Sequence, residues 1–181
     1  DAQESRGLGD VYKRQSLIRS IWSIQVVSLK AIRSAGTLSE LAAACRRAAS
    51  TLDKDVNKIK QEAGRELAFR LIYETPVDTS LALSNWQASL VFPTTRKIPA
   101  HKEGHFGSTK EYSAARAYAA AAKMIKSAKP RIDVVMTHNL PYIHKLNLGG
   151  SPQQSAFFIE RIVAQVNNKA QAQLKDYVNG Y

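Results

Sequence analysis

The sequence predicts an α+β fold with a long N-terminal helix, a small β-sheet and a C-terminal helix packed on it. Two segments, about 39–73 and 155–177, have apolar residues every three or four positions, which is the period of a helix. Two shorter segments, 86–90 and 131–137, alternate apolar and polar residues as strands do. A chain of 181 residues is long enough for one such domain, which we place at 35–181.

Residues 1–34 are predicted to be a leader of doubtful nativeness that is poorly ordered. The run from Gly7 to Gln15 resembles a stretch that recurs at the ends of unrelated translated sequences, so we exclude it from the fold. From 17 to 32 the chain is apolar but is interrupted by Arg19, Gln25 and Lys30. It therefore falls short of the roughly 18 apolar residues of a membrane span, and we expect no membrane contact.

The helix predicted over about 39–73 carries one apolar stripe, made of Leu52, Val56, Ile59, Ala63, Leu67 and Leu71. At 1.5 Å per residue this helix would be roughly 50 Å long, more than the diameter of a small domain. Either part of the stripe is buried against another subunit, or the helix bends back near 48–51. The sequence favours the first alternative, an oligomer.

A proline corner ends this helix, because Pro76 cannot continue it and moves Thr75 out of the helical region. In the strand that follows, Trp86, Ala88 and Leu90 share one face. Residues 94–109 have no periodicity and contain a proline and two glycines, so they are predicted to form an exposed loop. No neighbouring cluster of acidic residues or cysteines completes a metal site with the two histidines of this loop, and we expect no cofactor.

The second half of the predicted domain is a helix, a strand, a short helix and the terminal helix. The helix at 111–127 is predicted to pack through Tyr112, Ala115, Ala119, Ala122 and Ile125. After the strand at 131–137, Asn139 is expected to cap a short helix that Pro141 begins and Gly149 and Gly150 close.

Positive charge is concentrated in the middle of the chain. The net charge is +11, and the segment from 96 to 131 has nine Lys or Arg residues against Glu103 and Glu111, which gives +7. The nine are Arg96, Lys97, Lys102, Lys110, Arg116, Lys123, Lys126, Lys129 and Arg131. Such a segment is typical of nucleic-acid contact, but it also suits an acidic partner protein or a repulsive, soluble surface.

Signatures of catalysis are absent from the sequence. It has no Walker-type phosphate loop, dinucleotide fingerprint, His-Glu-x-x-His pattern or Gly-x-Ser-x-Gly elbow. The single Cys45 excludes an intrachain disulfide framework and a zinc cluster. Asp78, Asp133 and His138 have no spacing that forces them together. We therefore predict no catalytic residue and a protein that is not an enzyme.

Two ordered motifs carry a resemblance to a known family. The first consists of Thr75, Pro76, Val77, Asp78 and Thr79, followed by Ser84, Asn85 and Trp86. The second consists of Asn139, Leu140, Pro141, Tyr142 and Ile143, followed by Leu146, Asn147, Gly149, Gly150 and Ser151. Together they resemble the signature of the phage tail-completion family, also called neck or head–tail joining proteins, over roughly residues 40–176. Ser80 departs from that pattern, since the family often has Gly there, and residues 154–157 replace a common Gln-Ala-Pro-Ala-Gly run.

The resemblance implies a non-enzymatic virion protein with an α+β fold, made in the host cytoplasm and located in the neck or upper tail. It implies a homo-oligomeric ring whose partners are further copies of itself and the neighbouring portal, connector and tail proteins, with non-specific contact to passing DNA. Trp86, Tyr142, Leu146 and the helix stripes are expected to hold the protomer together. The long helix and the loop from Arg96 to Lys110 are expected to contact neighbours.

Two alternatives stay open. A basic nucleic-acid-binding module would use residues 96–131, and its affinity would fall steeply with salt. A hydrolase would need an activity that a single side-chain change abolishes.

Overall fold

The computed structural model describes residues 38–179, and the chain divides into two units, Asp1–Leu52 and Asp53–Tyr181. The described part of the first unit is helical and forms the N-terminal portion of α2 (Leu38–Glu74). The leader predicted at 1–34 and the boundary at residue 35 lie outside the described residues. The second unit contains the rest of α2 and all the other elements.

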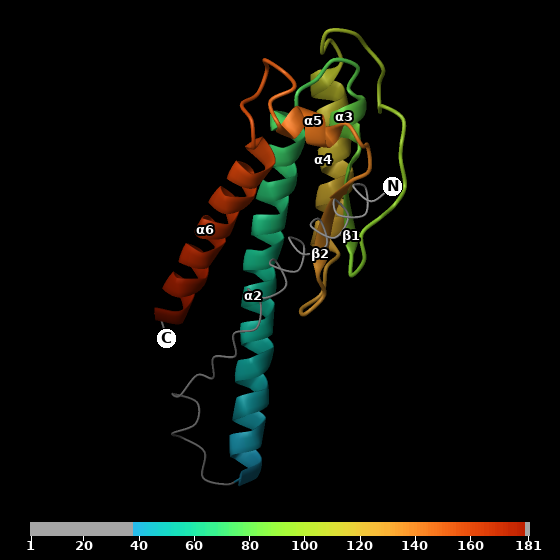
Figure 1. Ribbon diagram of the computed structural model, residues 1–181. Helices are drawn as coiled ribbons and strands as arrows, with labels where there is room; N and C mark the ends of the chain where they lie inside the picture. Colours follow the sequence, from blue (N-terminus) through green and yellow to red (C-terminus); the bar gives the residue numbers. More distant parts are fainter. Residues whose placement is uncertain (1–37, 180–181) are drawn as a thin grey trace, which may run out of the picture. The chain divides into compact units, whose positions relative to one another are not determined.

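The described residues have the α+β fold that the sequence predicts, with the elements in the expected order (Figure 1). After α2 come α3 (Leu81–Ser84), β1 (Trp86–Leu90), α4 (Lys110–Lys126), β2 (Val134–His138), α5 (Ile143–Asn147) and α6 (Phe158–Asn179). The four-residue α3 is the element that the sequence did not predict. It is too short for a helical apolar period to be visible.

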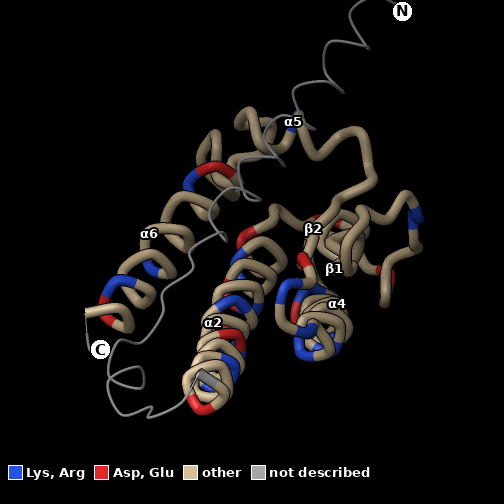
Figure 2. The backbone as a smooth tube through the Cα atoms, turned by 90° about the horizontal axis from the view of Figure 1, so that it is seen from below, with Lys and Arg blue, Asp and Glu red and all other residues tan. Residues whose placement is uncertain are grey.

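The long helix α2 is helical without interruption through 48–51, so no break in the helix turns the chain there. It ends where Pro76 requires. Thr75 stabilises this end, because its hydroxyl donates a hydrogen bond of 2.5 Å to the carbonyl of Leu71. From Asp53 onward, α2 lies between α6 on one side and α4 with the sheet on the other, as both views show (Figures 1 and 2).

The sheet has two antiparallel strands, with Trp86 opposite His138 and Leu90 opposite Val134. The predicted inner face of β1 is confirmed for Trp86, which belongs to the core cluster, and for Ala88, which packs against the cluster together with Met136 opposite it. Strand β2 begins three residues later than predicted. The cause is a turn at 129–132, where Arg131 has φ of 65° and the Ile132 amide donates to the Lys129 carbonyl.

The core of the second unit brings α2, α3, α4 and α6 together with the sheet. Its fully buried large side chains are Ile72 of α2, Leu83 of α3, Ile125 of α4, and Phe158 and Ile162 of α6. Helices α2 and α4 approach closely at Gly64, where an added Cβ would lie 3.2 Å from Ile125 Cγ2.

The predicted packing face of α4 is wrong except for Ile125. The buried face consists of Ser113, Ala114, Ala117, Ala121 and Ile125, whereas Tyr112, Ala115 and Ala119 are exposed. Alanine occurs on every side of this helix, so apolar periodicity does not distinguish its inner face from its outer face.

Candidate functional site

The two motifs meet where β1 pairs with β2. The rings of Trp86 and His138 lie 4.8 Å apart in an edge-to-face arrangement. The indole N–H of Trp86 donates to the buried hydroxyl of Thr75 at 2.8 Å. Residues from the start and end of the first motif and from just before the second therefore form one buried junction.

Asn85 fastens the loop that follows β1 to this junction. Its side-chain oxygen accepts from the Ile98 amide at 3.0 Å, and its side-chain nitrogen donates to the Ile98 carbonyl at 2.8 Å and to the Leu81 carbonyl at 2.9 Å. Asn85 is completely buried. A buried amide with three such bonds satisfies backbone groups that lack secondary-structure partners.

Two buried hydroxyls hold the next part of the same loop. The amide of His101 donates to Ser84 Oγ at 3.1 Å, and the amide of Lys102 donates to Ser113 Oγ at 3.1 Å. The predicted loop at 94–109 therefore has no secondary structure but is fixed by side chains of α3, α4 and the first motif.

Asp78 holds the tip of this loop. Its Oδ1 accepts from the Phe106 amide at 2.9 Å, and its backbone carbonyl accepts from the Gly107 amide at 2.9 Å. Ser80, which departs from the family pattern, has φ of 63° and bonds through its hydroxyl to Thr109 at 2.9 Å. Its left-handed backbone explains why glycine suits this position. Pro76 and Val77 are buried, and Thr79 is exposed.

The second motif contributes differently from the prediction. Asn139 does not cap α5, because its side chain donates to the Arg96 carbonyl at 2.8 Å and so fastens the start of the loop. Tyr142 occupies the N-cap position of α5 without a side-chain cap bond. Tyr142 is also 38% exposed and lies outside the core cluster. Burial of its hydroxyl raises the pKa of Tyr142.

The other residues of the second motif confirm the short helix. Leu140 and Ile143 are buried, Leu146 packs against the core, and Pro141 is exposed. The glycines end α5 as predicted. Gly149 has φ of 90°, and the Gly150 amide donates to the Lys145 carbonyl at 2.9 Å, where an added Cβ would lie 2.6 Å from that oxygen.

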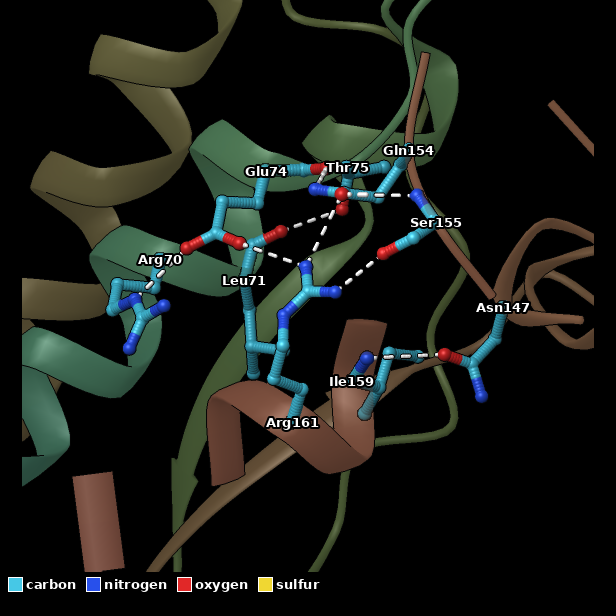
Figure 3. Close-up of polar contacts among 9 residues, drawn as sticks. All are labelled: Arg70, Leu71, Glu74, Thr75, Asn147, Gln154, Ser155, Ile159 and Arg161. Carbon is cyan, nitrogen blue, oxygen red and sulfur yellow. Dashed lines mark hydrogen bonds and ion pairs between the residues drawn. The ribbon is translucent and has the colours of Figure 1, made fainter. Parts of the chain in front are cut away.

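The second motif also fixes the start of α6 (Figure 3). The side-chain oxygen of Asn147 accepts from the Ile159 amide at 3.0 Å, so it caps α6 from another helix. Beside it, Arg161 donates to Gln154 at 3.1 Å and lies 3.6 Å from Glu74, at the end of α2 (Figure 3). Gln154 in turn donates to the Glu74 carbonyl.

Gln153 joins the first motif to the segment after the second. Its side-chain oxygen accepts from the Val77 amide at 2.9 Å, and its side-chain nitrogen donates to the Val77 carbonyl at 3.0 Å. The sequence analysis missed the roles of Gln153, Gln154, Ser84 and Asn147. Their partners are far away in sequence or on another element, so local patterns held no signal for them.

His138 is a half-buried side chain in this junction. Its Nε2 lies 2.8 Å from the Ala82 carbonyl, and Nδ1 accepts from the Leu140 amide at 3.4 Å. Burial lowers the pKa of His138 to about 4. Asp78 and Asp133 have other neighbours, since Asp78 holds the loop tip and Asp133 interacts with Lys60. Between residues 38 and 179 no group of three His, Cys, Asp or Glu side chains could hold a metal ion.

The nine basic residues differ in exposure and in their contacts. Arg116, Lys123 and Lys126 lie on the exposed side of α4, where Lys and Arg predominate (Figure 2). Lys110 is half-buried at the start of α4, Lys102 lies 5.5 Å from the ring centroid of Tyr112, and Arg131 forms an ion pair of 3.1 Å with Asp53. Arg96 and Lys97 are exposed in the loop, and Lys129 is exposed in the turn after α4.

A hollow of about 260 Å³ opens between the loop, α4 and β1. Trp86, Ile98, Ala117, Ala120 and Met124 form its apolar lining, and Arg96 and His101 lie at its edge. Burial and the nearby charge of Arg116 lower the pKa of His101. None of the residues that line this hollow is acidic.

Among the helices of residues 38–179, none combines the length and apolar character needed to cross a membrane. Comparison with protein-family models, with curated proteins and with solved structures found no match to this chain.

Proposed function

We propose that the protein is a structural virion protein of a tailed phage, a neck or tail-completion ring subunit that joins head to tail. The proposal begins from the two ordered motifs and their resemblance to that family. One observation carries it further: the polar motif residues Thr75, Asp78, Asn85 and Asn139 all hydrogen-bond within the protein to fix the corner and the loop. Their chemistry is used for architecture, which suits a building block.

A ring subunit contacts its neighbours through two different faces, because closed cyclic symmetry makes each contact heterologous. The fixed loop supplies candidate contacts, since Phe92 and Phe106 are exposed there. Leu148, exposed after α5, supplies another. Exposed aromatic side chains of this kind are enriched at protein interfaces.

Deleting the gene from its phage tests the proposal. We expect DNA-filled heads and separate tails in electron micrographs of the lysate, and rescue by the wild-type gene supplied in trans. Joined, infectious particles without the protein would contradict it. We also expect portal, capsid and tail genes to lie beside this gene.

The exposed side of α4 supports a second candidate function, the binding of nucleic acid. Arg116, Lys123 and Lys126 are exposed there without a carboxylate among them. Phosphate contacts release counterions, so replacing Lys123, Lys126 and Lys129 by Glu would reduce the slope of log affinity against log salt by about 2.7 for duplex DNA if all three bind phosphate. A matched triple, Lys54, Lys58 and Lys175 to Glu, changes the charge equally at exposed positions elsewhere. If both triple substitutions change the salt slope equally, Lys123, Lys126 and Lys129 contribute only non-specific electrostatic attraction to DNA.

A further inference from the structure

Phe106 is held outward at the tip of the loop. It is 98% exposed and has φ of 54°, which is unfavourable for a bulky residue. Two hydrogen bonds to Asp78 and one from Ser108 to His105 fix this turn. The structure thus fixes the backbone of a large apolar residue whose side chain lies outside the core. Backbone strain and exposure together point to a contact outside the protomer.

The hollow beside α4 has the size of a side-chain site. Its volume of about 260 Å³ is below the range of roughly 300–1,000 Å³ typical of small-molecule sites. Its lining is mainly apolar and includes Trp86 and three alanines of α4, of which Ala120 is exposed. An aromatic ring matches this lining better than a polar metabolite does.

The charges around the two features are complementary. Arg96 and His101 line the hollow, and Arg116 lies close enough to His101 to influence it. On the other side, the turn that carries Phe106 is held by the exposed carboxylate of Asp78, and Glu103 is exposed in the same turn. Lys102, the nearest lysine before Phe106, is directed to the ring of Tyr112.

We propose that Phe106 of one copy docks in the hollow of a second copy, with the acidic residues Asp78 and Glu103 facing Arg96 and Arg116 of that copy. The contact joins two different surfaces of the same chain, so it repeats from copy to copy. This inference rests on the proposed function and names the residues through which neighbouring ring subunits meet.

Sedimentation velocity of the full chain up to about 1 mM tests the docking. We expect self-association of the wild type, and a loss of at least about tenfold in affinity for Phe106→Ser and for Ala120→Trp, which fills the hollow. Phe157→Ser is the matched control, because Phe157 is also exposed and has φ of 59°. It should associate like the wild type.

Mixing the two defective proteins gives the sharpest result. Phe106→Ser keeps an intact hollow and Ala120→Trp keeps an intact Phe106, so together they should form a 1:1 complex that does not grow further. If Ala120→Trp does not fold, Arg96→Glu mixed with Glu103→Arg tests the same contact through its charges.

Three outcomes overturn the docking: Phe106→Ser associates like the wild type, the mixture stays monomeric while the wild type associates, or the wild type is monomeric at every concentration. None of them contradicts the proposed function, which the gene deletion decides separately. Conversely, the protein could self-associate through Phe106 while deletion of its gene leaves virions intact. That pair of results would support the docking contact and contradict the proposed role in the phage.

Discussion

The helical core and the loop at 94–109 are held by different kinds of contact. In the core, α2, α4 and α6 meet through apolar side chains such as Ile72, Ile125 and Phe158. The loop is held mainly by buried polar side chains, with Asn85 and Ser113 as examples. Apolar burial is non-directional and tolerates small shifts, whereas each of these hydrogen bonds needs one geometry. The comparison teaches that this chain fixes an irregular segment by a few amides and hydroxyls, whereas it fixes its helices by packing.

The largest effect should come from the core. Replacing Phe158 by Ala removes a fully buried ring and should cost about 3–5 kcal/mol in the free energy of unfolding, measured with urea. Its neighbour Phe157 is 57% exposed, so Phe157→Ala should stay within about 0.5 kcal/mol of the wild type. Similar losses for both variants would mean that the start of α6 is placed wrongly.

The next effect should come from the loop. Asn85→Ala leaves the amide and carbonyl of Ile98 without their partner and should cost about 2–3 kcal/mol. It should also speed trypsin cleavage at Arg96 and Lys97. Gln87→Ala is the matched control, since Gln87 makes one exposed bond to the same loop and should cost less than about 1 kcal/mol. Unchanged trypsin cleavage of Asn85→Ala would show that the loop does not depend on this amide.

The smallest of the three effects is a dependence of stability on pH, which arises from His138 in the polar junction. The folded pKa of His138 is lowered to about 4 from 6.5, so the unfolded chain binds more protons between these values. The contribution of His138 to the free energy of unfolding is therefore fully present above pH 6.5 and is lost as the pH falls toward 4. This loss amounts to roughly 2 kcal/mol between pH 7 and pH 5.

His138→Gln, which keeps a donor for the Ala82 carbonyl, should remove this share of the pH dependence in urea unfolding. His105→Gln, a change in the exposed loop, should retain it. An identical pH profile for wild type and His138→Gln would show that His138 is not buried in its neutral form.

The same contrast explains what the sequence could predict. Helices α2 and α6 have an apolar stripe against polar faces, so their existence and their bounds to within about three residues follow from periodicity. The inner face of α4 could not be found, because its alanines are equally apolar on both sides. The polar contacts could not be found either: the sequence indicates Asn139 as the cap of a local helix and Asn147 only as part of the second motif, yet their partners lie on other segments.

The position of α6 at the end of the described chain has a consequence for synthesis on the ribosome. The helix α2 is joined to α6 by contacts across about a hundred positions, as in the ion pair of Glu66 with Lys169, separated by 103 residues. At about 5–20 residues per second, the surface of α2 that α6 covers stays uncovered for roughly 5–20 s of translation. During that interval the surface of α2 that α6 later covers is open to solvent. A chaperone or a neighbouring nascent copy has time to bind this surface before α6 emerges.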